Sequence, residues 1–439
     1  MTEIETIAPV ERLAEMTFDR RAALLNRNRG RLRDLRPAVT NILEDVRARG
    51  DAAVLEYAAR FDTPPARLRV PEREITAALE RADPAYVAAL RQAAANIETF
   101  HRAQLVDEPP VETAPGVHVW RAWRPIERVG IYTPGGGALY PSCLLMAAIP
   151  ARVAGCREVA VCTPPGPDGR VPVEVLAAAA VAGVTEIFAI GGVQAIGAMA
   201  YGTESIRAVD KVFGPGNNYV AAAKAVIASE VAIDLFAGPS EVLIVADETA
   251  NPAWVAADFL AQAEHGSDSA CVVVTPSAAL AGRVRDEALR QLETLPTAAT
   301  MRASLARNGA LIVADTLDDA LDFANTYAAE HLELIVEDVD QALARIQHAG
   351  SVFIGGWSPV AAGDYASGGN HTLPTAAYAR GFGPLSIESF GRKMQVQRLE
   401  SAGLGGIRRS IERLAAAEGL HGHAASVRIR FESDEESDA

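Results

Sequence analysis

The sequence predicts an α/β protein with two successive doubly wound, incomplete Rossmann-like units, a helical N-terminal segment and a small C-terminal extension. Three observations lead to this prediction. The 439 residues exceed the usual length of one domain. Short β-branched runs alternate with alanine-rich stretches in two blocks, which is typical of parallel βαβ winding. This alternation stops after Gly383, and the chain beyond it is too short to hold its own core.

Helices are expected before the first strand. Residues 1–24 are predicted to form a helical arm. Residues 39–61 and 84–105 carry apolar side chains at helical spacing, which predicts one helix in each. Prolines 64, 65 and 71 separate the two, because proline removes a backbone donor and blocks helix continuation.

Two blocks of predicted strands follow, divided by the turn at residues 237–240. The strands of the first block are 129–132, 159–162, 187–190 and 209–213. Those of the second are 242–246, 271–275, 311–314, 334–336 and 352–354. The extension is expected to hold a helix at 407–418 and a strand at 426–431. We expect it to pack on another part of the protein, a second subunit included.

Composition limits the partners and the compartment. The net charge is −15, and no basic stripe is present, so nucleic acid is not an expected partner. The N-terminus is acidic where a secretory signal is basic, and the longest apolar run, 175–184, is too short to span a bilayer. We therefore expect a cytoplasmic protein without membrane contact. Its four cysteines form no C-x-x-C pair and are expected to be reduced core residues.

Gln262 and His265 end a predicted helix that Asn251 can cap and Pro252 can begin. Gly266 follows, where a left-handed terminating residue is favoured. Side chains three apart share one helix face, about 5–6 Å apart at their β-carbons. An amide oxygen and an imidazole could therefore meet one metal ion, although an ordinary polar helix end has the same pattern.

Other polar clusters could complete such a metal site. Asp364 in GDYASGGNH would add a carboxylate, and His423 in EGLHGH a second imidazole. Two nitrogen and two oxygen donors suit a catalytic zinc ion, with manganese and cobalt as alternatives. His421 lies two residues from His423, and by spacing alone either could reach the metal.

Four glycine-rich loops are candidates for anion binding: TPGGGALYP, IGGVQAIG, FGPGNNYV and AGPSE. Three of them follow predicted strands, and in open α/β sheets ligands bind beyond the carboxyl ends of the strands. Glycine also lets backbone amides approach an anionic group. None matches G-x-G-x-x-G, so tight-turn packing is an equal alternative.

Glu330 and His331 lie where a predicted helix, 318–329, meets a predicted strand. Histidine titrates near neutral pH, and burial can raise the pKa of a carboxylate, so the pair suits general base and water activator. The alternative is an imidazole capping the helix beside a solvated glutamate.

The motifs taken together closely resemble those of the histidinol dehydrogenase family. They run in order from about residue 30 to residue 430: ERVGIYTPGG, GGVQAIG, FGPGNNYVAAAK, IDLFAGPSEVLIVADETANP, LAQAEHG, AEHLEL, GDYASGGNHTLPT and AEGLHGHA. The resemblance implies a zinc-dependent homodimer that oxidises L-histidinol to L-histidine through L-histidinal. The oxidation takes two NAD-linked steps, the last of histidine biosynthesis.

The resemblance also implies roles for individual residues. The implied catalytic pair is Glu330 and His331. The implied zinc ligands are Gln262, His265, Asp364 and His423, with His423 and Glu418 contributed across the dimer interface. Implied substrate contacts are Ser240, Gln262, His265, His331, Asp364, His371, Glu418 and His423. Tyr132, Gln194 and Asn217 match positions associated with NAD.

We accordingly expect four parts. They are the arm 1–24, a larger domain of 25–131 and 241–382 with the metal and catalytic residues, an NAD-contacting domain 132–240, and the extension 383–439. Two alternative functions stay open at this stage: a sibling dehydrogenase acting on another small alcohol, and a noncatalytic module that binds metal and nucleotide.

Overall fold

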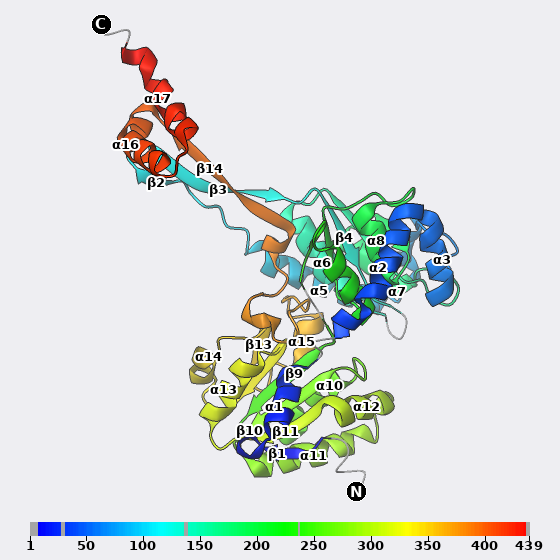
Figure 1. Cartoon of the computed structure of the whole chain (residues 1–439). Coiled ribbons are helices and arrows are strands. Elements are labelled where there is room, and N and C mark those ends of the chain that lie inside the picture. Colours follow the sequence, from blue (N-terminus) through cyan, green and yellow to red (C-terminus); the bar gives the residue numbers. More distant parts are fainter. Residues whose placement is uncertain (1–7, 28–30, 136–138, 236–237, 436–439) are drawn as a thin grey trace. The chain divides into compact units, whose positions relative to one another are not determined.

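A computed structural model describes residues 8–27, 31–135, 139–235 and 238–435. The chain divides into two compact units, one of Met1–Gln104 with Ile126–Phe390, the other of Leu105–Pro125 with Gly391–Ala439. The predicted α/β class with parallel sheets is confirmed, because the first unit holds two parallel sheets with helices between their strands (Figure 1).

The first parallel sheet has the order β6-β5-β4-β7-β8. Its strands are β4 (Arg128–Tyr132), β5 (Glu158–Thr163), β6 (Glu186–Ala189), β7 (Lys211–Phe213) and β8 (Ala232–Ile233). The helices between them are α6 (Pro141–Ala154), α7 (Val173–Ala182), α8 (Gly192–Tyr201) and α9 (Asn218–Ile227). All four strands predicted for this block are present, and the short β8 at the sheet edge was not predicted.

The second parallel sheet has the order β1-β11-β10-β9-β12-β13. Its strands are β1 (Val10–Arg12), β9 (Glu241–Ala246), β10 (Ala270–Thr275), β11 (Gly309–Val313), β12 (His331–Ile335) and β13 (Ser351–Ile354). Its helices are α10 (Pro252–Ala263), α11 (Ala278–Leu292), α12 (Ala298–Asn308), α13 (Leu317–Tyr327), α14 (Val339–Arg345) and α15 (Val360–Tyr365). The predicted helical arm 1–24 was wrong over Val10–Arg12, because this segment is β1 and pairs in parallel with β11, and the α-helix within the arm begins only at Phe18.

The two sheets repeat one topology. If β1 is left aside and the strands of each sheet are numbered along the chain, both sheets have the strand order third, second, first, fourth, fifth. The first three strands are added towards one edge of the sheet and the later strands towards the other edge. The switch lies between β4 and β7 in one sheet and between β9 and β12 in the other. Along β9, Val242 and Ile244 face one hydrophobic cluster, while Leu243 faces the other, as strand alternation requires. This sheet is thus buried on both faces.

The N-terminal helices are α1 (Phe18–Leu25), α2 (Arg31–Arg49), α3 (Asp51–Phe61), α4 (Glu72–Arg81) and α5 (Pro84–Arg102). The single helix predicted over 39–61 is split at Gly50, whose φ of +54° favours glycine. The packing also differs from the expected grouping of 25–131 with 241–382. Val39, Leu43 and Val54 belong to the core of the five-stranded sheet, together with Tyr132 and Phe188.

The second unit combines two distant segments. It holds the antiparallel sheet β14-β3-β2 and two helices: β2 (Val111–Ala114), β3 (Val117–Pro125), β14 (Gly391–Leu399), α16 (Ser401–Ala417) and α17 (His421–Glu435). Figure 1 shows β3 and β14 as long neighbouring strands, and they pair over their whole length. The extension thus does not pack alone, as expected, but its partner within the chain is residues 105–125.

The strand predicted at 426–431 was wrong. Its β-branched and aromatic residues alternate, yet the segment lies inside the helix α17. Ala424 and Val427, three residues apart, are buried, and α17 packs against α16. One buried helical stripe therefore outweighs the local strand preference, as packing often does.

Three short 3-10 turns complete the described structure: Leu13–Glu15, Tyr378–Arg380 and Ile387–Phe390. Within the described residues, no helix combines the length and the apolar character that a membrane span needs. The cysteines are free as expected, and three of the four, Cys143, Cys162 and Cys271, are buried.

Candidate active site

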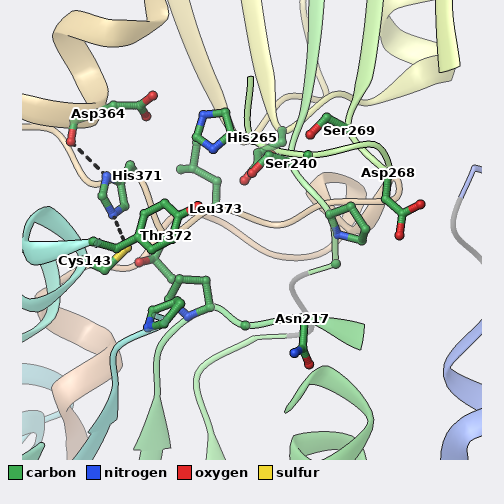
Figure 2. Close-up of a pocket in the computed structure, with 18 of the residues that line it drawn as sticks. Cys143, Asn217, Ser240, His265, Asp268, Ser269, Asp364, His371, Thr372 and Leu373 are labelled. Carbon is green, nitrogen blue, oxygen red and sulfur yellow. Dashed lines mark hydrogen bonds between the residues drawn. The ribbon is translucent and has the colours of Figure 1, made fainter. Parts of the chain in front are cut away.

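A cavity of about 440 Å³ lies within the first unit. One wall comes from loops that follow β4 and β7, including Pro134 and Asn217. The opposite wall comes from residues that precede β9 and β10 or begin β12, including Ser240, His265 and His331. Figure 2 shows Asp364 and His371 close together in this cavity, with Asn217 on the other wall. The five-stranded sheet therefore contributes the carboxyl ends of its strands to the cavity, as expected for ligand sites in open α/β sheets. The six-stranded sheet instead contributes the amino ends of its strands.

Glu330 and His331 both reach this cavity and are almost fully buried. The helix α13 ends at Tyr327, and the left-handed φ of +50° at the following residue, Ala328, turns the chain towards β12. The Glu330 carboxylate accepts a hydrogen bond from the backbone N–H of Glu241, at 2.8 Å. The alternative of a solvated glutamate beside a capping imidazole is therefore wrong for this pair.

The hydrogen bonds of His331 define its tautomer. Its Nδ1 lies 3.0 Å from the carbonyl oxygen of Glu241, which can only accept, so Nδ1 carries the proton. Nε2 then presents a lone pair. It is buried without a hydrogen-bond partner in the described structure, and lies 3.7 Å from Oδ1 of Asp364. This nitrogen can accept a proton from a group in the cavity.

Burial controls the charges at the site. It lowers the pKa of His331 to about 3 and that of His371 to about 4, so both imidazoles are neutral at pH 7. Burial raises the pKa of Asp364 to about 7. Burial, and then the nearby Glu241 carboxylate, raises the pKa of Glu330 well above its ordinary range. Burial thus disfavours the charged form of each of these four side chains.

Gln262 does not line the cavity itself, but it lies three residues before His265, which does. Gln262 lies in the last turn of α10, which Asn251 caps and Pro252 begins, as predicted. Its side chain is buried, and neither its oxygen nor its nitrogen has a hydrogen-bond partner among the described residues. A buried amide without partners costs free energy, so a ligand for it is expected. The helix ends at Ala263, and His265 therefore lies in the following turn instead of on the helix.

The donors near Gln262 suit a metal ion. His265 and Asp364 line the cavity, and together with Gln262 they offer an imidazole, a carboxylate and an amide oxygen. In the described residues no group of three or more histidine, cysteine, aspartate or glutamate side chains is placed to hold a metal. The first unit therefore offers an incomplete donor set, and the unsatisfied amide is the observation that fits a metal here.

His371 lies beside this donor set (Figure 2). Its Nδ1 donates to the carbonyl oxygen of Asp364, at 2.9 Å. Its Nε2 lies 3.2 Å from Sγ of Cys143. Because burial raises the pKa of Cys143 to about 12, this contact is a thiol donating to a neutral imidazole. Cys143 is buried as predicted, but it also lines the cavity, which no sequence pattern indicated.

The positions matched to NAD divide into two groups. Tyr132 and Asn217 line the cavity, since Tyr132 ends β4 and Asn217 follows the neighbouring strand β7. Asn217 also caps α9 through bonds from the N–H groups of Tyr219 and Val220. Gln194 is buried in α8, after β6, and does not line the cavity. Residues 136–138 of the first glycine-rich loop lie outside the described part of the chain.

Glu418 and His423 belong to the second unit. Glu418 ends α16, His423 lies in α17, and both side chains are exposed. His421 is equally exposed, so the structure of the single chain does not choose between the two histidines.

Two further residues join this site. The buried Glu241 contacts Glu330 and His331 and forms an ion pair with Arg27 at 2.5 Å. Glu241 is the last residue of the AGPSE motif, in which the glycine and Ser240 carry the predicted binding role and the glutamate carries none. No pattern singled out Arg27, which lies 214 residues away in the sequence.

Three comparisons with known proteins agree over nearly the whole chain. A family model described as histidinol dehydrogenase matches residues 25–431. The histidinol dehydrogenase of Methanosarcina barkeri is 47% identical over 423 residues, covering 96% of this chain and 97% of that protein. That of Methanothermobacter thermautotrophicus is 46% identical over 421 residues, covering 96% and 99%. The crystal structure of histidinol dehydrogenase from Elizabethkingia anophelis has a TM-score of 0.92 at 40% identity, covering 98% and 99%.

Proposed function

This chain belongs to the histidinol dehydrogenase family of oxidoreductases, and on that premise we propose that it oxidises L-histidinol to L-histidine through L-histidinal, using NAD and zinc. The observation that carries the proposal is His331, whose buried and unpartnered Nε2 lies 3.7 Å from Oδ1 of Asp364, in a cavity that Glu330 also lines. A proton acceptor next to incomplete metal donors is what an alcohol oxidation requires.

The proposed zinc ligands of one subunit are Gln262, His265 and Asp364. His423 of the partner subunit completes the set in a homodimer, and Glu418 reaches the substrate with it. The incomplete donor set of the first unit and the exposed position of His423 support this arrangement. Zinc, when bound, would hold the imidazole and amine of the substrate and so orient its alcohol carbon.

NAD would supply the hydride acceptor for both oxidations. Tyr132 and Asn217 are the proposed contacts best supported by position, because both line the cavity at the switch between β4 and β7. Gln194 stays a proposed contact with less support, since it is buried outside the cavity lining. Ser240 and His371 line the cavity and are the proposed substrate contacts.

Two residues would move the protons. His331 accepts the hydroxyl proton at Nε2 as the alcohol carbon loses its hydride, which yields the aldehyde. Glu330 then accepts a proton from the water as its oxygen adds to the aldehyde carbon. The hydrate anion formed in this way loses a second hydride to NAD and becomes the acid, and each residue releases its proton to solvent after its step. Both groups are buried, which keeps the aldehyde from bulk water between the steps.

The proposal is tested by NADH formation from a panel of alcohols. We expect L-histidinol to give the highest kcat/KM, a chelator to abolish the reaction, and added zinc to restore it. A higher kcat/KM with another alcohol would indicate a sibling dehydrogenase. If zinc-loaded protein binds NAD but forms no NADH from any alcohol, a noncatalytic binding module would replace the proposal.

The variant Gln262→Met distinguishes a role of Gln262 in zinc binding from a role in the stability of the fold. Without metal, this variant is expected to be about 1–3 kcal/mol more stable than the wild type, because a buried unsatisfied amide is removed. Its zinc affinity should fall roughly tenfold or more, since a donor is lost. Urea unfolding of metal-free protein and zinc titration measure the two effects.

Gln291→Met is the matched control. The Gln291 amide donates to the carbonyl oxygen of Ala253 on α10, so its loss should destabilise the protein and leave zinc affinity unchanged. Unchanged zinc affinity in Gln262→Met would remove Gln262 from the ligand set.

A further inference from the structure

Glu241, the first residue of β9, holds both proposed catalytic groups through one backbone segment. Its N–H donates to Oε2 of Glu330 at 2.8 Å, and its carbonyl accepts from Nδ1 of His331 at 3.0 Å. A small rotation of the backbone at Glu241 would therefore misplace the carboxylate and release the imidazole at once.

The side chain of Glu241 is itself held from several directions. Arg27 donates to its two carboxylate oxygens at 2.5 and 2.6 Å, which is a bidentate geometry. Its Oε1 also accepts from the backbone N–H groups of Glu330, at 3.3 Å, and Ala376, at 3.1 Å. The carboxylate thus ties β9 to the start of β12 and to the segment after His371.

Arg27 is equally well held. It donates to the carbonyl oxygen of Tyr327 at 3.0 Å, and its guanidinium lies 3.4 Å from the centre of the Tyr327 ring. Tyr327 is fully buried at the end of α13, three residues before Glu330. Arg27 therefore contacts Glu241, which begins β9, and Tyr327, which ends α13 shortly before Glu330.

Strained backbone gathers around the same junction. In the described chain, the non-glycine residues with positive φ are Ala328, Ala376 and Ala377. Left-handed backbone is unfavourable for alanine, so surrounding contacts must hold it in place. Ala376 donates to Glu241, and Ala328 lies two residues before Glu330. Such strain is typical of functional sites, where neighbouring structure maintains it.

We propose that Glu241, anchored by Arg27, is the positioning residue that sets the orientation of Glu330 and the tautomer of His331. The proposal rests on the proposed function for its kinetic consequences. Neither residue lines the cavity, so neither acts on the substrate directly. A role in stability alone is the competing explanation, because any buried ion pair destabilises the fold when one partner is removed.

The decisive variant is the double substitution Arg27→Met with Glu241→Gln. It removes both charges together, which avoids leaving one charge buried alone. We expect kcat for L-histidinol to fall roughly 10- to 100-fold per folded protein, with KM changed less than about threefold, as for lost supporting contacts at other sites. Arg27→Lys keeps the charge and should recover part of kcat, because only the bidentate geometry is lost.

Arg128→Met is the matched control. Arg128 is a buried arginine that binds Glu158 and Glu186, at 2.6 and 2.7 Å, and it begins β4 at the end opposite the cavity. Its loss should lower the melting temperature and leave kcat per folded protein unchanged. An equal loss of kcat in Arg128→Met, or a kcat within twofold of wild type in the folded double variant, overturns the proposal.

A second readout does not need activity. NMR of protein with ¹⁵N-labelled histidine, assigned with His331→Asn, should report one tautomer protonated at Nδ1 in the wild type and a mixture in the double variant. An unchanged His331 tautomer in the double variant also overturns the proposal. If the wild type oxidises no alcohol, the proposed function fails, and the tautomer comparison still tests the positioning role.

Discussion

Glu330→Gln is expected to slow the oxidation of L-histidinal by about 10²–10⁴-fold, the usual contribution of a general base. The first oxidation should lose far less, because His331 accepts the proton in that step. Glutamine keeps the shape of the side chain and can still accept from the Glu241 N–H, yet it cannot take a proton from water. Separate assays that start from the alcohol and from the aldehyde measure the split.

The pH dependence of aldehyde oxidation provides a second measure. Burial raises the pKa of Glu330, so its carboxylate form is scarce at low pH and grows as pH rises through that raised value. The wild-type rate should therefore rise with pH, and this rise should be absent from Glu330→Gln.

Glu333→Gln is the matched control for Glu330. Glu333 is a buried glutamate of β12, three residues after Glu330, and it accepts from the N–H of Val360 instead of reaching the cavity. Its substitution should leave the ratio of the two half-reactions unchanged. Equal losses of both half-reactions in Glu330→Gln would remove the water-activating role.

Mixing two inactive variants is expected to restore activity. Asp364→Asn and His423→Ala should each lose nearly all activity, because each lacks one proposed zinc ligand. In a mixed dimer, one site combines an intact Asp364 with an intact His423 from the other subunit. Random exchange of equal amounts makes half of the dimers mixed, so about a quarter of wild-type activity should return.

The control for this experiment pairs Asp364→Asn with His265→Ala. Both ligands are proposed to come from the same subunit, so every site of a mixed dimer stays defective and no activity should return. Mass spectrometry of the exchanged dimers checks that mixing occurred. Exchange without recovery in the first pair would show that His423 does not act across the interface.

Most strands of the two parallel sheets could be predicted, because runs of β-branched residues between glycines and prolines are a local signal. The antiparallel sheet of the second unit could not be predicted in this way. This sheet joins residues 111–125 to residues 391–399, and no local pattern reports pairing over that distance. The helix α17 was misread for the same reason, since its stripe of Ala424 and Val427 has meaning only beside α16.

The candidate site was likewise predictable in part. Motifs identified Gln262, His265, Glu330, His331 and Asp364 by residue type and context. They did not separate Asn217, which lines the cavity, from Gln194, which does not. Strand order explains that difference, because β4 and β7 are neighbours while β5 separates β6 from β4.

The sequence by itself determined the family and the α/β class, and it supplied the residues proposed for the chemistry, because these depend on local periodicity and on short motifs. Tertiary structure alone decided which strand ends line the cavity. It also decided that Glu241, paired with Arg27, contacts Glu330 and His331. It decided as well that Gln262 is left unsatisfied. Each of these outcomes depends on burial and on contacts between distant segments, and chain topology sets both.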